Sequence, residues 1–362
     1  MKSSLTYITD VTHGPNLTCM NFGFTTLTHP PSPFSCKRRG IEGVELQRTS
    51  SKFKVKSVLH NISYIIVIVV LLSACSSGEK TMQGSGNQSW SRQIADSFIA
   101  RHPGAVTYDS GSSSQKWNYE QGLMLVALYK LWQHTNDKRY FEFMQDNLDL
   151  YVENDGNIKT YKLEDYNKDN IGPGRALLAA YQEKKKEKYK VAADLLMLQL
   201  RRQPRTNEGG FWHKKIYPYQ MWLDGLFMAE PFHAWYAQMF NEPKAFDDIV
   251  NQFIWISSHT RDAKTGLYYH AWDESKQQRW ANPETGCSPH FWGRAIGWYG
   301  MGLIDVLDYM PERHPKRKQL ETLLKELAES LLKFRDGKSH LWYLLLDQGD
   351  KEGNYFESSA SS

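Results

Sequence analysis

The distribution of apolar residues predicts a helical protein from residue 91 onward. Apolar positions recur at steps of three and four, as in Leu123, Val126, Ala127 and Leu131, which is the spacing of one face of an α-helix. Strand-like alternation is scarce, so the predicted class is all-α. Helices are predicted over 93–100, 121–133, 138–152, 173–183, 189–201, 222–239, 244–258, 292–310 and 317–334.

A loose repeat underlies these helices. A polar or aromatic cluster opens one helix, and a second, more charged helix follows. The openings lie at 117–122, 169–174, 222–225 and 292–295, and 354–357 resembles a further one. A period of about fifty residues predicts helix pairs stacked into a solenoid or closed toroid, in which the first turns of the inner helices converge at one mouth. Helix N-termini present free amide hydrogens and a positive dipole end, so such a mouth suits an anionic ligand.

The segment before the helices resembles a bacterial lipoprotein signal. Three lysines precede an apolar run at 62–72, and Leu72, Ser73, Ala74 and Cys75 follow in lipobox order. We therefore expect residues 55–75 to be the signal segment, with Cys75 lipidated and the protein held in the bacterial cell envelope. A cleaved signal without lipid, giving a periplasmic protein, and a membrane anchor are the alternatives.

The flanking segments carry no folding pattern. Residues 1–54 are rich in Pro, Ser and Thr without helical or strand periodicity, so they are expected to be a disordered upstream extension whose presence in the mature protein is doubtful. Residues 76–90 are rich in Ser and Gly and are predicted to be a flexible tether.

The composition argues against one class of partner and favours another. Hydrophobic residues make up 41% of the chain and charged residues 23%, and a net charge of +4 is too mild to suggest nucleic acid as a partner. The 12 Trp, 20 Tyr and 16 Phe exceed the usual needs of a core, and flat rings stack well on sugars. The alternative interpretation is a helical core that is rich in aromatic rings. The four cysteines show no metal-binding spacing, and neither metal nor cofactor is predicted.

Two carboxylates stand out at helix openings. Asp224 is flanked by Trp222, Leu223 and Phe227, and partial desolvation raises the pKa of a carboxyl, which suits a proton donor near neutral pH. Asp169 lies before the Pro and Gly residues that open another helix, and two carboxylates in one mouth would allow acid and base chemistry. Helix capping is the alternative interpretation for both residues.

Two histidines and an aromatic cluster with arginine complete the candidates. His213 and His270 lack a metal-binding partner at helical spacing, so they bind substrate by hydrogen bonds or are structural. Arg294 can fork onto a carboxylate while Trp292 and Trp298 stack on a sugar, or the three can pack internally.

Several of these motifs together resemble a known family. The strongest are YPYQMWLDGLFMAEPF at 217–232, YYHAWDE at 268–274 and SPHFWGRAIGWYGMGLIDVLDYMP at 288–311, with weaker matches at 167–178 and 356–362. Residues 91–362 resemble glycoside hydrolase family 105, the unsaturated rhamnogalacturonyl hydrolases, a group related to the unsaturated glucuronyl hydrolases of family 88.

The resemblance implies a fold, an activity and roles for residues. The fold is an (α/α)6 helical barrel, here incomplete and apparently truncated at the C-terminus because members of the family continue past the equivalent of Ser362. The activity is removal of an unsaturated uronic acid from lyase-generated oligosaccharides, most simply of rhamnogalacturonan type, by hydration of its C4–C5 double bond. Asp224 matches the catalytic acid and base. The residues that match the substrate-binding positions are Asp169, His213, Trp222, His270, Trp292, Arg294 and Trp298.

Two further functions stay open at this point. One is a family 88-like glucuronyl hydrolase acting on glycosaminoglycan or other lyase products, and the other is a carbohydrate-binding toroid without catalysis. The sequence decides neither the leaving sugar nor the oligomeric state.

Overall fold

The computed structural model describes residues 89–106 and 116–362. The predicted extension at 1–54, the signal segment with Cys75 and nearly all of the tether at 76–90 lie outside this range. Within it, no helix is long and apolar enough to cross a membrane.

The described chain is built from helix pairs. After α3 (Trp90–Arg101), the elements are α4 (Tyr119–Thr135), α5 (Lys138–Tyr151), the 3₁₀ helices η2 (Leu163–Asp165) and η3 (Lys168–Asn170), α6 (Gly174–Lys184), α7 (Glu187–Arg202), β1 (Gln220–Trp222), α8 (Leu223–Met239), α9 (Ala245–Thr260), β2 (Ala271–Asp273), α10 (Gly293–Tyr309), α11 (Arg317–Lys333) and α12 (Ser358–Ser361). The all-α class is confirmed, and the predicted starts at 121, 173, 222 and 292 lie within two residues of the observed ones.

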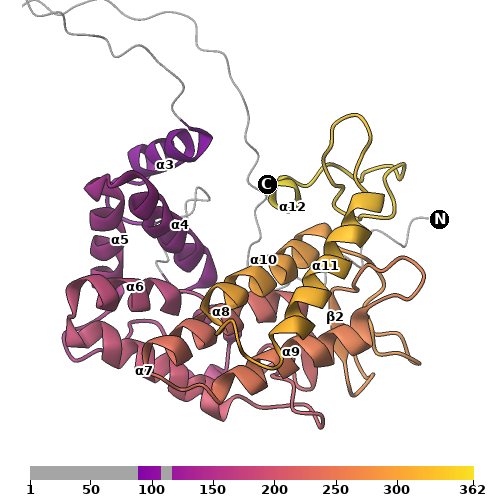
Figure 1. Cartoon of the computed structure of the whole chain (residues 1–362), viewed down its shortest axis with the longest axis horizontal. Coiled ribbons are helices and arrows are strands. Elements are labelled where there is room, and N and C mark those ends of the chain that lie inside the picture. Colours follow the sequence, from indigo (N-terminus) through magenta and orange to yellow (C-terminus); the bar gives the residue numbers. More distant parts are fainter. Residues whose placement is uncertain (1–88, 107–115) are drawn as a thin grey trace, which may run out of the picture. The chain divides into compact units, whose positions relative to one another are not determined.

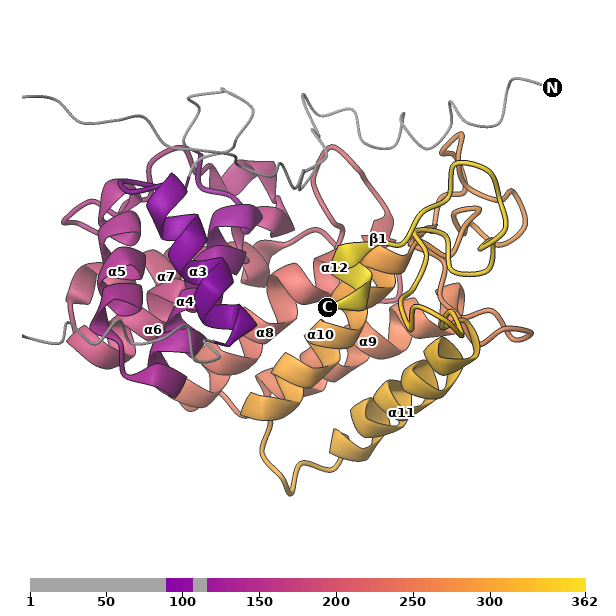
Figure 2. The same cartoon turned by 90° about the horizontal axis from the view of Figure 1, so that it is seen from above.

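The pairs form two layers. The helices α4, α6, α8 and α10 contact one another in chain order and form the inner layer (Figure 1). Each is paired with the helix that follows it, and α11 lies against both α9 and α10 (Figure 2). This arrangement of helix hairpins agrees with the helix pairs predicted from the repeat and with the helical-barrel fold that the resemblance implies.

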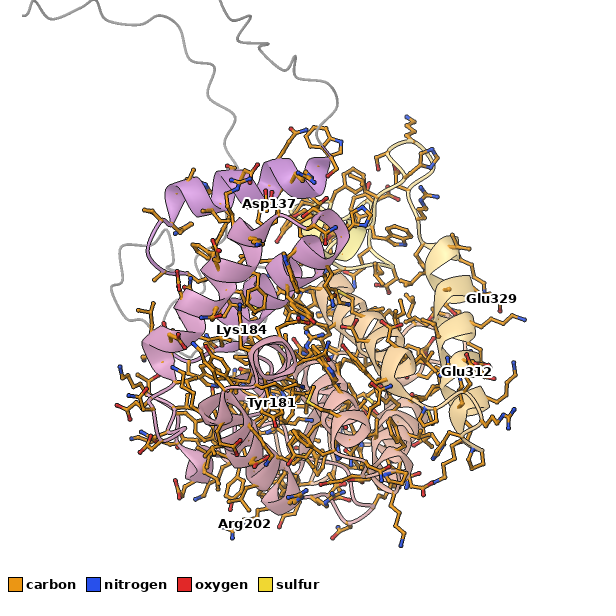
Figure 3. The ribbon with its side chains drawn as sticks, turned by 60° about the vertical axis from the view of Figure 1, so that its left-hand side comes forward. Asp137, Tyr181, Lys184, Arg202, Glu312 and Glu329 are labelled. Atoms are coloured by element: carbon orange, nitrogen blue, oxygen red, sulfur yellow. The ribbon has the colours of Figure 1, made fainter. Side chains whose placement is uncertain are left out.

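Residue pattern explains which helices lie inside. Apolar residues are spread around the whole circumference of α8, and nearly all of its residues are buried. Helix α11 instead buries only a stripe that includes Leu320 and Leu327. Exposed charged side chains such as Arg202 and Glu329 point outward from the outer helices (Figure 3).

A short two-stranded ribbon is the element that the apolar pattern did not predict. Strands β1 and β2 pair antiparallel, with Trp222 opposite Ala271 and Gln220 opposite Asp273. Three residues are too few to show alternation in the sequence, which is why the ribbon was missed. Strand β1 lies directly before α8, and β2 follows α9 along the chain. Their pairing therefore ties together the two ends of that helix pair.

Candidate active site

The openings of the inner helices meet at one end of the described fold, as the repeat predicted. The indole nitrogen of Trp117, before α4, donates a 2.8 Å hydrogen bond to the carbonyl of Asn170, before α6. The ring of Tyr119 in α4 meets that of Trp298 in α10 edge to face, and Trp298 also packs on Phe227 of α8. Residues of α4, α8 and α10, together with the segments directly before α4 and α6, therefore share one region.

Asp224 lies in the first turn of α8, but it does not cap the helix. The N-cap residue is Trp222, and no side chain makes a capping bond there, so the capping interpretation of Asp224 is wrong. Its side chain is 15% exposed, and its Oδ2 lies 2.8 Å from Nε2 of His270, close but not aligned as a hydrogen bond. Because Leu223 donates its amide hydrogen to the carbonyl of His270, the two residues are held side by side.

Asp169 lies in η3 and contacts two cationic or potentially cationic groups. Its Oδ2 is 2.6 Å from Nζ of Lys214, and its Oδ1 is 3.4 Å from Nε2 of His213. Helix α6 begins after Pro173 without a side-chain cap, so capping of α6 by Asp169 is also wrong. Lys214 was missed by the sequence reasoning; its only signal there is that it directly follows His213.

Aromatic rings line the space beside these carboxylates. Trp222 stacks on His213, with ring centres 4.5 Å apart and an interplanar angle of 11°, and on Tyr217 at 5.0 Å and 16°. The ring of His270 meets Trp222 and Trp292 edge to face, at 5.2 and 4.8 Å. The predicted residues His213, Trp222, His270 and Trp292 are thus continuous with one another.

The remaining two predicted residues differ in their surroundings. The guanidinium carbon of Arg294 lies 4.9 Å from the ring centre of Trp292, and its Nη2 is 3.9 Å from Glu357. This side chain is 36% exposed, so it can reach a ligand. Trp298 is only 8% exposed and is packed on Phe227, so most of its surface already supports the core.

The phenol of Tyr119 interacts electrostatically with both Asp169 and Asp224. Burial raises the pKa of its phenol, and the nearby charges of Glu120, Asp169 and Asp224 raise it further. The hydroxyl therefore stays protonated and can donate a hydrogen bond. The sequence placed Tyr119 in a helix opening without assigning it to the site.

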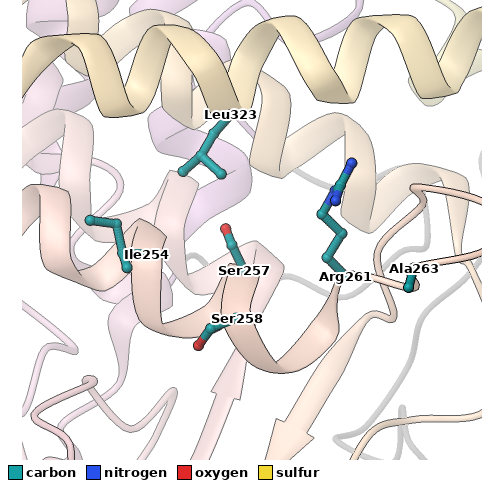
Figure 4. A pocket seen from close by; sticks show the side chains of 6 residues that line it. All are labelled: Ile254, Ser257, Ser258, Arg261, Ala263 and Leu323. Carbon is teal, nitrogen blue, oxygen red and sulfur yellow. The ribbon is translucent and has the colours of Figure 1, made fainter.

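Among residues 89–106 and 116–362, no cluster of three His, Cys, Asp or Glu side chains is placed to hold a metal ion. A surface pocket between α9 and α11 (Figure 4) shares no residue with the aromatic and acidic group described above; its lining is Ile254, Ser257, Ser258, Arg261, Ala263 and Leu323.

Comparison with known proteins gives a consistent result. Residues 90–362 match the model of Glycosyl Hydrolase Family 88. A solved glycoside hydrolase from family 105 of C. acetobutylicum is 45% identical, with a TM-score of 0.72 over 76% of this chain and 74% of that one. The unsaturated rhamnogalacturonyl hydrolase YesR of Bacillus subtilis is 27% identical over 252 residues, 68% of each chain.

A further relative is shorter. Protein Atu3128 of Agrobacterium fabrum is 39% identical over 135 residues, which are 37% of this chain and 57% of that protein. The chain thus spans just over half the length of that curated relative.

Proposed function

Because the chain belongs to glycosyl hydrolase family 88, we propose that it is an unsaturated uronyl hydrolase. Its reaction removes the unsaturated uronic acid from the non-reducing end of oligosaccharides released by polysaccharide lyases. The observation that carries this proposal is the placement of Asp224, a partly buried carboxylate beside His270, at an opening shared by all the inner helices.

The reaction follows from the chemistry of the substrate. Its C4–C5 double bond is an enol ether, so Asp224 donates a proton to C4, and water deprotonated by the same carboxylate adds at C5. The resulting hemiketal opens and releases the remaining sugar. One carboxylate serves as acid and then as base, so no second nucleophile is required. His270 lies close enough to Asp224 to steady its carboxylate through this cycle.

The surroundings of Asp224 suit a ring that carries a carboxylate. Lys214 and Arg294 supply positive charge, and the N-termini of α8 and α10 add the positive ends of their dipoles. Trp292 presents a ring on which the uronate can stack, whereas Trp222, already stacked on His213 and Tyr217, lines the space beside it. These groups would bind and orient the substrate, while Asp224 performs the proton transfers.

For the substrate class, we propose products of rhamnogalacturonan lyases. The similarity to YesR and to the family 105 enzyme supports this choice over glycosaminoglycan products. A protein that cleaves only unsaturated glucuronyl disaccharides from glycosaminoglycans would contradict the substrate class and leave the reaction type intact.

The test is loss of the ultraviolet absorbance of the conjugated uronate when the full chain is mixed with lyase-generated disaccharides. Asp224→Asn should lower kcat by roughly 10²- to 10⁴-fold while the variant still binds the disaccharide in calorimetry. Asp308→Asn, on the exposed side of the last turn of α10, is the matched control and should keep wild-type turnover. Binding without turnover by the wild-type protein would instead support a carbohydrate-binding toroid.

We also propose that Cys75 is lipidated and anchors the protein in the bacterial cell envelope, because of the lipobox order of residues 72–75. Metabolic labelling with a radioactive fatty acid should mark the wild-type chain. Cys75→Ser should carry no label, and a labelled variant would contradict the proposal.

A further inference from the structure

A lysine is buried behind the site and is not used by the proposed reaction. Lys168 of η3 is completely buried, and its Nζ has no hydrogen-bond partner among the described residues. Its ammonium lies 5.8 Å from the ring centre of Phe211. An unpaired ammonium in the interior is costly to folding, so its presence there calls for a reason beyond stability.

The side chain of Lys168 ends beside His213. A Cβ atom built on Gly225 would lie 2.6 Å from Nζ of Lys168 and 2.9 Å from Nδ1 of His213. Both nitrogen atoms therefore lie close to Gly225, the residue that follows Asp224 in the chain. The amide of Lys168 also donates a 3.1 Å hydrogen bond to the carbonyl of His213, which holds the two residues together.

The charges around the ammonium decide its protonation. Burial lowers the pKa of Lys168 to about 8, with Arg205 acting in the same direction, whereas Glu230, Asp169 and Asp224 oppose this shift. The ammonium is therefore mostly protonated at neutral pH and loses its proton at moderately alkaline pH. Glu230 of α8 is itself completely buried, and burial raises its own pKa.

His213 is neutral, so it carries one ring hydrogen. Burial, reinforced by the positive charges of Lys214 and Lys168 and by His270, holds its pKa well below the ordinary value. Its Nε2 faces the Asp169 carboxylate at 3.4 Å, and its Nδ1 has no hydrogen-bond partner in the described chain. A carboxylate only accepts hydrogen bonds and an ammonium only donates them.

We infer that Lys168 is a positioning residue whose ammonium, buried behind His213, selects the Nε2–H tautomer of that ring and so directs a donor toward Asp169. The opposite tautomer would set a lone pair against the carboxylate and a hydrogen against the ammonium. Trp222, stacked on the imidazole, keeps the ring plane fixed while the tautomer is selected. The effect on turnover rests on the proposed function, whereas the tautomer itself does not.

The first experiment reads the tautomer without substrate. Nitrogen NMR of histidine-labelled protein at neutral pH, with the His213 signals assigned from His213→Gln, should show protonated Nε2 in the wild type. Lys168→Met, which keeps an unbranched side chain but removes the charged nitrogen, should shift the ring toward the Nδ1–H form or a mixture. An unchanged Nε2–H signal in this variant would overturn the inference.

The second experiment separates positioning from stability. Lys168→Met should lower kcat by between about tenfold and a hundredfold with little change in KM. The wild-type kcat should fall above about pH 8, as Lys168 loses its proton, and the variant should lack this fall. Its melting temperature at neutral pH should equal or exceed that of the wild type, because an unpaired buried charge is removed. A lower melting temperature that accounts for the lost activity would assign Lys168 a structural role.

The pH dependence of folding provides an independent check. Because the pKa of Lys168 is about 8 in the folded chain and 10.5 in its ordinary state, the unfolded chain binds more protons between these values, and wild-type stability gains with pH in this window relative to Lys168→Met. Lys162→Met, at an exposed position before η2, is the matched control and should change neither stability nor the tautomer. Failure of every preparation to turn over any unsaturated disaccharide would contradict the proposed function and leave the NMR result to decide the inference.

Discussion

The indole ring of Trp222 stacks on two other rings, those of His213 and Tyr217, and meets His270 edge to face. This one side chain therefore orients both histidines that face the carboxylates. We expect Trp222→Ala to lower kcat/KM by on the order of 10²-fold, because the imidazoles lose the surface that fixes their planes. Steady-state kinetics on the unsaturated disaccharide, with a folding check by circular dichroism, measures this effect.

The matched variant for this position is Trp222→Phe. A phenyl ring retains a stacking face for His213, so most of the activity should remain. Equal losses in the Ala and Phe variants would mean that the indole N–H, which donates to Gln220 at 3.0 Å, matters more than the stacking.

At the scale of single residues, motif chemistry named several residues that the structure places side by side. Asp224 and Trp292 stood in predicted helix openings and His270 in an aromatic loop segment, and the fold brings the three together. The motifs did not indicate Lys214 or Lys168, because a lysine beside a candidate site residue has no distinctive sequence pattern. Their roles depend on burial and on which way the backbone turns at 167–170 and 213–215, which only the folded chain specifies.

Among the elements, the close approach of α4 and α6 depends on Gly122. A Cβ at this position would lie 2.6 Å from backbone atoms of Pro173, a contact that neither helix can relieve by moving a side chain. Gly122→Ala should therefore lower the free energy of unfolding by about 1–3 kcal/mol, measured by urea denaturation.

Gly297→Ala provides the control for this prediction. It is also a helical glycine, but its Cβ would lie 3.8 Å from the nearest atoms, in α12. The alanine should be neutral or stabilising by up to about 1 kcal/mol through its greater helix propensity. Similar destabilisation by both variants would show that helix packing at Gly122 is looser than the structure indicates.

The sequence predicted the helices better than it predicted the ribbon. Openings such as those at Tyr119 and Gly293 combine a change of periodicity with Gly or aromatic residues, and they were located within two residues. The strands β1 and β2 are recognisable only by their pairing, which joins residues about fifty positions apart in the chain.

At the scale of the whole fold, a cluster of three charged side chains joins the inner helices. Arg175 of α6 is 2.5 Å from Asp305 of α10 and lies 4.4 Å from the ring centre of Phe227 in α8, while Lys130 of α4 reaches the same Asp305 at 2.9 Å. Arg175 is almost fully buried, and burial lowers its pKa against the opposing effect of Asp305.

Asp305→Asn should destabilise the fold by about 3–5 kcal/mol, because it leaves the Arg175 guanidinium buried without its carboxylate. Lys130→Met removes only the exposed end of the group, since the Lys130 side chain is 53% exposed, and should cost less than about 1 kcal/mol. Urea denaturation of the two variants distinguishes them. Comparable losses would mean that the buried ion pair carries no special weight in holding the inner layer together.

The ribbon of β1 and β2 also separates what must stay fixed from what is free to vary. It holds Trp222 and His270 at a set spacing, and the pairing of Trp272 with Cys287 closes the base of the loop that follows. Exposed residues of that loop, such as Pro283 and Glu284, can therefore be substituted without moving the ribbon. Sequence can drift at such positions while the surroundings of Asp224 stay the same.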